Sequence, residues 1–334
     1  MSFVIRLLMI ILLLFLVEFY FTRKTVRAVK RIFPDISKKK IKRTTLTGLI
    51  ILNLFPLLLI SAWAYAYIAQ TENIRQPENF FYEYFVLYPF WIGITIIIQS
   101  IVLLIPLDLI KLIIYVPFKK FRDKLKTIHA WVVFVLVSVI SLYVPVRIIY
   151  DLNTISTRTA EYTKENLPAV LDGYRITFIA DVQADQFTKY SKLHNYIEKV
   201  NATNPDLVLI AGDIVTGNPD YISLAAEYLG KIKARYGVYS CVGDHDNWAY
   251  RNDYERSLRE ITEALAKVNI KMIDNGKVNI AVDSANIGIT FITNTYVERI
   301  PDNLLDSLSN HSKHYDLKIF LTHQPREYLL DKAV

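Results

Sequence analysis

Apolar and polar positions divide the chain of 334 residues into two unlike halves. Four long apolar stretches occupy the first half, at about 3–21, 46–69, 84–118 and 130–150. A helix needs about 20 apolar residues to cross the hydrocarbon core of a bilayer. The third stretch is too long for one crossing, so we place its span at 86–107 and interpret the remainder as an amphipathic extension at the interface. Residues 1–150 are therefore predicted to form an α-helical membrane domain of about four transmembrane helices.

Charge is distributed unequally along the chain and predicts the orientation of these helices. Residues 1–150 carry 19 Lys and Arg against 7 Asp and Glu, whereas the remaining residues carry 20 against 25. Ten cations lie in residues 22–45 and five in residues 119–128, while residues 70–83 hold only Arg75. Short loops rich in Lys and Arg stay in the cytoplasm. Both basic loops are therefore expected to be cytoplasmic, and the chain from residue 151 onward extracytoplasmic.

These patterns predict an integral membrane protein of a bacterial inner or plasma membrane, with the lipid bilayer as its partner. Specific binding of anionic lipid headgroups is a second interpretation of the basic loops, beside topology alone. No nucleic-acid partner is expected, because the net charge of +7 originates in the membrane half. Glu18 and Asp108 lie near the ends of predicted spans, and we assign both to the interface. The sequence leaves the oligomeric state open.

The second half has the alternating pattern of an α/β domain. Residues 151–172 are polar and predict a linker. From residue 173 to 334, strand-like runs are predicted at 174–180, 206–211, 237–242, 270–273, 277–282, 287–293 and 317–321. Helical segments follow the first three strands, at 190–204, 221–234 and 253–268, and another helical run occupies 326–334. Strands that alternate with helices predict a largely parallel sheet covered by helices.

Acidic and imidazole side chains lie just past the carboxyl ends of four predicted strands: Asp181, Asp213, Asp244 and His323. Ligands of open α/β sheets bind outside these strand ends. Carboxylates gathered at one place need a cation to neutralise them, and an oxygen and nitrogen donor set suits divalent Mn, Fe or Zn. Two such ions can clamp the attacking and leaving oxygens of a phosphate ester. Helix N-capping is the alternative role for each aspartate taken alone.

Three short motifs occur in order, each after a strand, and a later histidine follows them: Asp181-Val182-Gln183, Gly212-Asp213-Ile214-Val215, Gly243-Asp244-His245-Asp246 and His323. In this order and spacing the chain resembles the calcineurin-like metallophosphoesterase superfamily, and residues before the first motif resemble its membrane-anchored members. The resemblance covers about residues 167–325. It implies an α/β/β/α sandwich and a metal-dependent phosphoric ester hydrolase.

The resemblance also implies a set of metal ligands. Asp213 would bridge two divalent ions, Asp181 and Gln183 would bind the first, and Asp244 and His323 would bind the second. Gln183 stands where the family has a histidine, which weakens the first site. Asp244 replaces the usual asparagine and adds a negative charge.

Catalytic roles follow from the same resemblance. His245 would face the substrate and stabilise phosphoryl oxygens or protonate the leaving group. Asp246 would orient and charge the imidazole of His245. A metal-bound hydroxide would be the nucleophile. Asn218 and Asn294 are weaker candidates for contact with the substrate.

Three functional hypotheses remain open. The first is a membrane-anchored dimetal phosphoesterase acting on a phosphodiester, pyrophosphate or phosphomonoester, for example of a lipid or envelope component. The second is a non-enzymatic membrane sensor or binding module on a degenerate phosphoesterase scaffold. It is motivated by Gln183 and by the lack of the family's final Gly-His-x-His block, which leads us to expect a C-terminally truncated, incomplete domain. A transport role ranks last, because the predicted spans show no paired ionisable residues.

Overall fold

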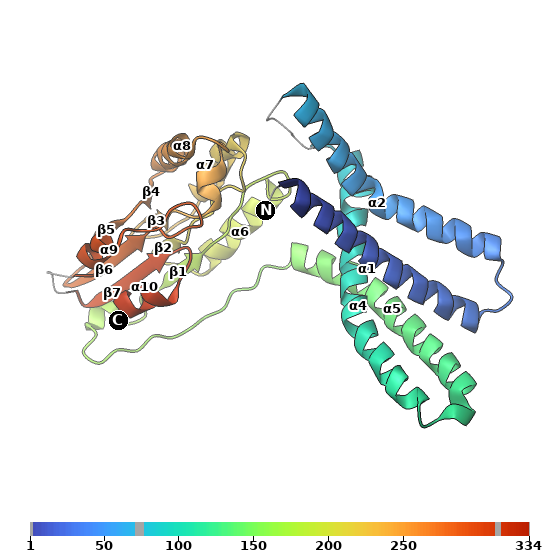
Figure 1. The fold of residues 1–334 in the computed structure, drawn as a ribbon. Helices are drawn as coiled ribbons and strands as arrows, with labels where there is room; N and C mark the ends of the chain where they lie inside the picture. Colours follow the sequence, from blue (N-terminus) through green and yellow to red (C-terminus); the bar gives the residue numbers. More distant parts are fainter. Residues whose placement is uncertain (1–2, 71–76, 311–314, 334) are drawn as a thin grey trace. The chain divides into compact units, whose positions relative to one another are not determined.

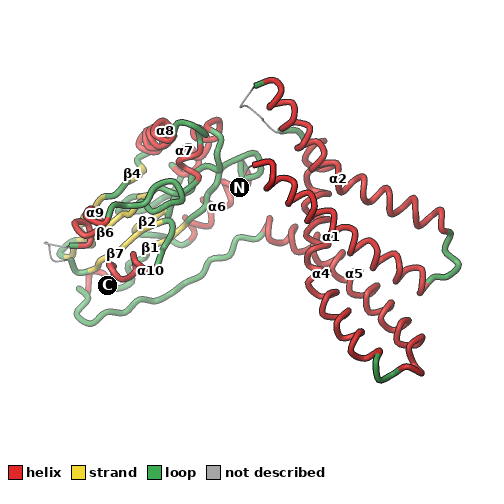
Figure 2. Tube along the Cα trace, viewed as in Figure 1, coloured by secondary structure: helices red, strands yellow, loops and turns green. Residues whose placement is uncertain are grey.

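The computed structural model describes residues 3–70, 77–310 and 315–333, and the chain divides into two compact units, Met1–Thr154 and Ile155–Val334 (Figure 1). Part of the predicted loop at 70–83, including Arg75, lies outside the described residues. Figure 2 separates the units by content, because one is helical throughout and the other contains all described strands. Each unit is described by itself.

The first unit consists of long apolar helices joined by short connections. Its elements are α1 (Phe3–Ile32), α2 (Lys38–Ala69), α3 (Phe80–Tyr82), a π-helical turn (Glu83–Leu87), α4 (Tyr88–Tyr115), a 3₁₀ turn (Lys119–Phe121) and α5 (Arg122–Asn153). Within the described residues, three helical segments are long and apolar enough to cross a membrane: Lys38–Ala69, Phe80–Tyr115 and Arg122–Asn153. They contain three of the four predicted spans. The remaining predicted span, residues 3–21, lies in α1, and its crossing of the membrane stays a prediction.

Helices α1, α4 and α5 pack around a small apolar core. Small and branched side chains fill it, namely Ala28 of α1, Leu104 of α4, and Ala130, Val133 and Val137 of α5. Helix α5 runs antiparallel to both neighbours. Near its first turns, Arg31 at the end of α1 contacts Thr127, and Arg122 donates to the carbonyl of Tyr115 at the end of α4. It follows that α1 and α4 run in the same direction.

Polar side chains also pair within this unit. The carboxylate of Asp108 contacts Lys24, Tyr20 and His129, and Glu18 accepts a hydrogen bond of 2.8 Å from the amide of Asn53. Lys24, Asp108 and His129 lie just outside the predicted spans, and Asn53 does not ionise, so the expectation that the spans lack paired ionisable residues stays a prediction. The partners lie far apart in sequence, up to 88 positions for Tyr20 and Asp108.

The second unit contains two sheets. Four parallel strands form the first in the order β1 (Ile176–Ile179), β2 (Leu207–Ile210), β3 (Val238–Cys241) and β4 (Ile270–Ile273). The second sheet has the order β5 (Gly276–Val282), β6 (Ala285–Ile292) and β7 (Leu317–Thr322), with β5 and β6 antiparallel and β6 and β7 parallel. Each strand lies at or within about two residues of its predicted position.

Strand β2 shows how the layers assemble. Successive side chains of a strand point to opposite faces of the sheet. Val208 and Ile210 face a core shared with α6 (Ser191–Ala202), α7 (Ile222–Leu229) and α8 (Tyr254–Ala266). Leu207 and Leu209 instead pack against side chains of the second sheet, including Phe291 of β6. All four are completely buried, which explains the uninterrupted apolar run of this strand.

Two short helices cover the other face of the second sheet. Helices α9 (Asp302–Ser309) and α10 (Glu327–Ala333) contribute Leu305 and Leu329 to a core with Ile292 of β6. The layers therefore follow the order helix, sheet, sheet, helix, which confirms the predicted α/β/β/α sandwich. Helix α9 had not been predicted from the sequence.

Candidate metal centre

Loops after β1, β2 and β3 meet at one edge of the first sheet. In the parallel register Ile179 lies opposite Ile210, and Ile210 lies opposite Ser240, so the residues that follow these strands also become neighbours. The two glycines in these loops permit the contact. Gly212 has φ +79°, and a Cβ at Gly243 would lie 2.2 Å from the backbone nitrogen of Asp213.

Several residues of the site have strained backbone conformations. Asp181, Gln183 and Asp213 have φ values of 53°, 44° and 58°, which is the left-handed region that side chains with a Cβ rarely adopt. Residues held in such conformations cluster at functional sites, where the surrounding structure enforces them. Here the backbone N–H of Gln183 donates to the carbonyl of Asp213, and that of Asp181 donates to the carbonyl of Gly212.

Asp181, Asp213 and His323 form a group that can hold a metal ion. One ligand atom from each lies within 4.8 Å of the others. The Nδ1 of His323 lies 2.6 Å from the carbonyl oxygen of Ala211. A carbonyl only accepts, so Nδ1 carries the proton. Nε2 is left 3.5 Å from the carboxylate of Asp213 and 3.6 Å from that of Asp244. A histidine that ligates a metal is commonly oriented by such a bond to its other nitrogen.

The electrostatics of this group also fit a cation. Burial raises the pKa of Asp181, and the neighbouring carboxylate of Asp213 raises it further. The side chain of Asp213 is 2% exposed and also accepts a hydrogen bond of 2.9 Å from the backbone N–H of His245. Two carboxylates and an imidazole nitrogen are a donor set that suits a divalent transition metal.

Gln183 and Asp244 lie beside this group with other partners. The amide of Gln183 donates to the second carboxylate oxygen of Asp213 at 3.1 Å. Asp244 accepts hydrogen bonds from the backbone N–H of Tyr296, at 2.5 Å, and from the amide of Gln324. The structure brings both residues to the site, and their roles as ligands stay predictions.

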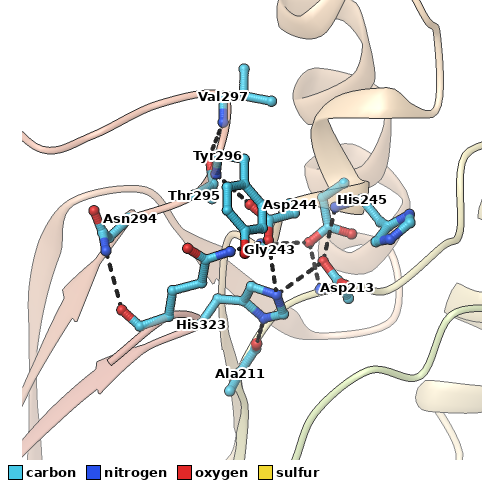
Figure 3. Close-up of polar contacts among 12 residues, drawn as sticks. Ala211, Asp213, Gly243, Asp244, His245, Asn294, Thr295, Tyr296, Val297 and His323 are labelled. Atoms are coloured by element: carbon cyan, nitrogen blue, oxygen red, sulfur yellow. Dashed lines mark hydrogen bonds and ion pairs between the residues drawn. The ribbon is translucent and has the colours of Figure 1, made fainter. Parts of the chain in front are cut away.

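His245 and Asp246 are arranged differently from the prediction. The Nδ1 of His245 donates to the backbone carbonyl of Thr216, so the ring is oriented by main chain. In Figure 3, Asp213 lies between the rings of His323 and His245. The carboxylate of Asp246 is completely buried and accepts backbone N–H groups from Asp213, Ile214 and Gly243. The prediction that Asp246 orients His245 was wrong, because burial directs its carboxylate to the loops beneath the site.

The two asparagines proposed for substrate contact both form hydrogen bonds within the domain. Asn218 caps the 3₁₀ turn at Pro219–Tyr221 by accepting from the backbone N–H of Asp220. Asn294 is completely buried. Its amide donates to the carbonyl of Gln324 at 3.1 Å and accepts from the hydroxyl of Tyr328 at 2.7 Å. The prediction for Asn294 is therefore corrected, since both polar atoms of its side chain bond within the fold. The prediction for Asn218, which is half-buried, stays a prediction.

Comparison with known proteins agrees with this fold. Residues 174–333 match the family model of the calcineurin-like phosphoesterases. This segment is a calcineurin-like phosphoesterase domain. It contains every residue assigned to the metal centre, and it begins two residues before β1.

Relatives of the chain combine this domain with membrane segments or are named for it alone. A transmembrane protein with metallophosphoesterase domain from Danio rerio is 37% identical over 86 residues, which are 26% of this chain and 20% of the relative. An uncharacterized metallophosphoesterase of Campylobacter jejuni is 25% identical over 231 residues, 67% of this chain and 57% of the relative. Another uncharacterized metallophosphoesterase, from Bacillus subtilis, is 26% identical over 170 residues, which are 48% of this chain and 59% of the relative.

The chain thus spans between about a fifth and three fifths of the length of these relatives. No solved structure gives a significant match. Together with the three apolar helices, the transmembrane relatives indicate that the protein is a membrane protein.

The phosphoesterase domain also places residues beside its metal centre that the sequence did not single out. Tyr296 is 77% exposed and adjoins Asp244 through its backbone. Arg326 donates to the side-chain oxygen of Gln324 at 2.9 Å, and its guanidinium lies 5.8 Å from the centre of the Tyr296 ring. Gln324 had a signal in the sequence, because it directly follows His323. Tyr296 had none, since 52 positions separate it from Asp244.

Proposed function

We propose that the protein is a membrane-anchored, metal-dependent phosphoesterase that hydrolyses a phosphodiester, a pyrophosphate or a phosphomonoester. One observation carries the proposal, namely the group of Asp181, Asp213 and His323 at the strand ends of a calcineurin-like phosphoesterase domain. Candidate membrane helices in the same chain support the anchoring. We place the catalytic domain outside the cytoplasm, because the basic loops favour that orientation.

Two divalent ions of Mn, Fe or Zn are proposed for this centre. Asp213 is the residue suited to hold both, with Asp181 and Gln183 on one side and His323 and Asp244 on the other. When bound, such ions supply Lewis-acid activation of a phosphoryl oxygen and of water. Gln183 can serve as a metal ligand if its side-chain amide rotates to direct the oxygen toward the ion. The oxygen carries the lone pairs, whereas the NH₂ group only donates.

His245 is proposed to act on the phosphate through Nε2. Its Nδ1 proton is held by the carbonyl of Thr216, so a neutral ring presents Nε2 as an acceptor. Only the protonated ring can donate from Nε2, either to a phosphoryl oxygen or to the leaving group. Arg326 and Tyr296, on the Asp244 side of the centre, can contact the part of the substrate beyond the reacting phosphate.

The substrate class follows from the anchoring. A domain tethered to apolar helices meets phosphate esters at the membrane surface at high local concentration. A lipid or another envelope component is therefore the proposed substrate. A binding module that holds metal without turnover is the second candidate, which Gln183 favours, because its amide occupies the position of a stronger imidazole ligand.

Hydrolysis of bis(p-nitrophenyl) phosphate by the full-length chain tests the first proposal. The protein would be stripped of metal and then loaded with Mn, Fe or Zn. We expect metal-dependent turnover, which Asp213→Ala reduces by about 100-fold or more, because even the outer partners of metal ligands cost about 10–100-fold. Asp172→Ala removes an exposed carboxylate outside the site and serves as the matched control.

Metal content measured on the same samples separates the two candidates. Bound metal without turnover in any loading would favour the binding module. Turnover that survives Asp213→Ala unchanged would contradict both candidates, because neither allows function without this carboxylate.

A further inference from the structure

A second group of charged side chains lies in the helical unit, where α1, α4 and α5 meet. Asp108 of α4 accepts a hydrogen bond of 2.8 Å from the hydroxyl of Tyr20 and forms an ion pair with Lys24, both on α1. The Nε2 of His129 on α5 lies 3.2 Å from the same carboxylate. The side chains of Lys24, Asp108 and His129 are 14–26% exposed. Three helices thus fix one partly buried carboxylate and its partners.

This group lies at the boundary between apolar and polar chain on each of the three helices. Lys24 follows the apolar stretch 3–21, Asp108 directly follows the span 86–107, and His129 directly precedes the stretch 130–150. Because α5 is antiparallel to α1 and α4, these three boundaries coincide. The group therefore lies where hydrocarbon gives way to lipid headgroups, on the side predicted to be cytoplasmic.

Further cations surround the group and leave it with an excess of positive charge. Arg27 lies three positions after Lys24 on α1, Lys111 three positions after Asp108 on α4, and Lys126 three positions before His129 on α5. Residues three apart on a helix are neighbours on its surface, so each of these cations adjoins a member of the group. Within the described part of the chain, Arg27, Lys111 and Lys126 form no ion pair. Arg31 adds nothing to the excess, since Asp123 pairs with it at 2.6 Å. We call Lys24, Arg27, Asp108, Lys111, Lys126 and His129 the basic cluster. It contains four Lys and Arg and a single carboxylate.

We propose that the basic cluster binds the phosphate headgroup of an anionic phospholipid. Phosphate oxygens accept charge-assisted hydrogen bonds from Lys and Arg, and basic pockets between membrane helices on the cytoplasmic side hold such headgroups. Asp108 fixes the position of Lys24, while Arg27, Lys111 and Lys126 supply the unpaired charge. The headgroup would relieve the repulsion among these cations.

The surroundings of the cluster favour a lipid over a soluble phosphate. Leu109, Ile110, Leu112 and Ile113 of α4 lie on both sides of Lys111 in sequence, and each is 51–71% exposed. Exposed apolar side chains at this position provide the surface that acyl chains cover. A free phosphate would leave that surface without a partner.

Native mass spectrometry of the full chain tests the proposal, using nanodiscs of phosphatidylcholine that contain a minor fraction of phosphatidylglycerol. The double variant Lys111→Gln/Lys126→Gln removes two cations of the cluster. The matched control Lys39→Gln/Lys40→Gln removes two exposed cations at the start of α2. A Lys or Arg near an anionic surface contributes about 1 kcal/mol, so we expect retention of phosphatidylglycerol to weaken about fivefold per charge in the cluster variant.

Retention of phosphatidylglycerol should weaken much less in the control variant, and neither variant nor the unmodified chain should retain phosphatidylcholine. Equal losses in the two variants would show general surface attraction and overturn the proposal. Equal retention of the two lipids by the unmodified chain would do the same. Inorganic phosphate that displaces the lipid at low concentration would instead identify a soluble-anion site. Thermal unfolding of both variants establishes that each is folded.

Discussion

Asp246 contributes to the site from beneath it. Its carboxylate accepts N–H groups from Asp213 and Ile214, which follow β2, and from Gly243, which follows β3, at 2.7–3.0 Å. Complete burial raises the pKa of Asp246 to about 7, although the three N–H donors act in the opposite direction. The residue thus joins the two loops that carry Asp213 and Asp244.

Asp246→Asn should destabilise the phosphoesterase domain. An amide offers a single acceptor oxygen, so its NH₂ group would face at least one of the three backbone donors. We expect the free energy of unfolding to fall by about 1–3 kcal/mol, the cost of leaving a buried polar group unsatisfied. Asp253→Asn is the matched control, because Asp253 caps α8 through one N–H and Asn caps equally well.

Pulsed thiol labelling in urea measures this effect. Cys241, the only cysteine in the sequence, is completely buried in β3, so its reaction reports unfolding of this domain alone. Equal stability of the two variants would contradict the role assigned to Asp246.

At the scale of the elements, the close approach of two loops shapes the candidate metal centre. The loops after β2 and β3 meet at Gly212 and Gly243, where a Cβ on Gly243 would also lie 2.2 Å from the Oδ1 of Asp213. Any side chain there must move Asp213 or separate the strands. Strand register alone would align these loops, but only glycine allows them to touch.

Gly243→Ala should therefore be costly. We expect a loss of about 3 kcal/mol or more, at the upper end of the effects of overpacking, together with reduced metal binding because Asp213 is displaced. Gly173→Ala provides the comparison. Gly173 also has positive φ, at +71°, but a Cβ there would have no heavy atom within 4 Å, so only the conformational penalty of about 1–2 kcal/mol applies.

Labelling of Cys241 in urea and metal content measured together would report both effects. A Gly243→Ala protein as stable as Gly173→Ala would contradict the argument from close approach.

At the scale of the whole molecule, one chain joins candidate membrane helices to a phosphoesterase domain. Its Lys and Arg are concentrated in two segments of the helical unit, around residues 22–45 and 119–128. The same segments supply three of the four Lys and Arg of the basic cluster, namely Lys24, Arg27 and Lys126. Orientation in the membrane therefore determines both the leaflet that the cluster would meet and the compartment of the phosphoesterase domain.

Cysteine labelling in intact cells tests this orientation. Ala160 is exposed in the segment before the phosphoesterase domain, and Lys39 is exposed in the first basic segment. We expect an impermeant maleimide to label Ala160→Cys, and to label Lys39→Cys only after the cells are opened. The native Cys241 is buried and should not react. The reverse pattern would place the phosphoesterase domain in the cytoplasm.

The sequence by itself determined the elements and the order of the site motifs. Strands such as β2 and β6 could be located because burial requires short apolar runs, and Asp181, Asp213 and His323 could be placed at strand ends by the same reasoning. These features depend on residues that are neighbours in sequence. Local periodicity is therefore sufficient to reveal them.

Only the tertiary structure decided which groups those side chains contact. The carbonyl that orients His245 lies 29 positions away, and the partners of Asp246 lie up to 33 positions away. The contact of Asp108 with Lys24 spans 84 positions. Such pairings depend on the packing of distant elements, where burial leaves each polar atom a limited choice of partners. For that reason the sequence motifs located the site, whereas only the fold determined the hydrogen-bond partners of its side chains.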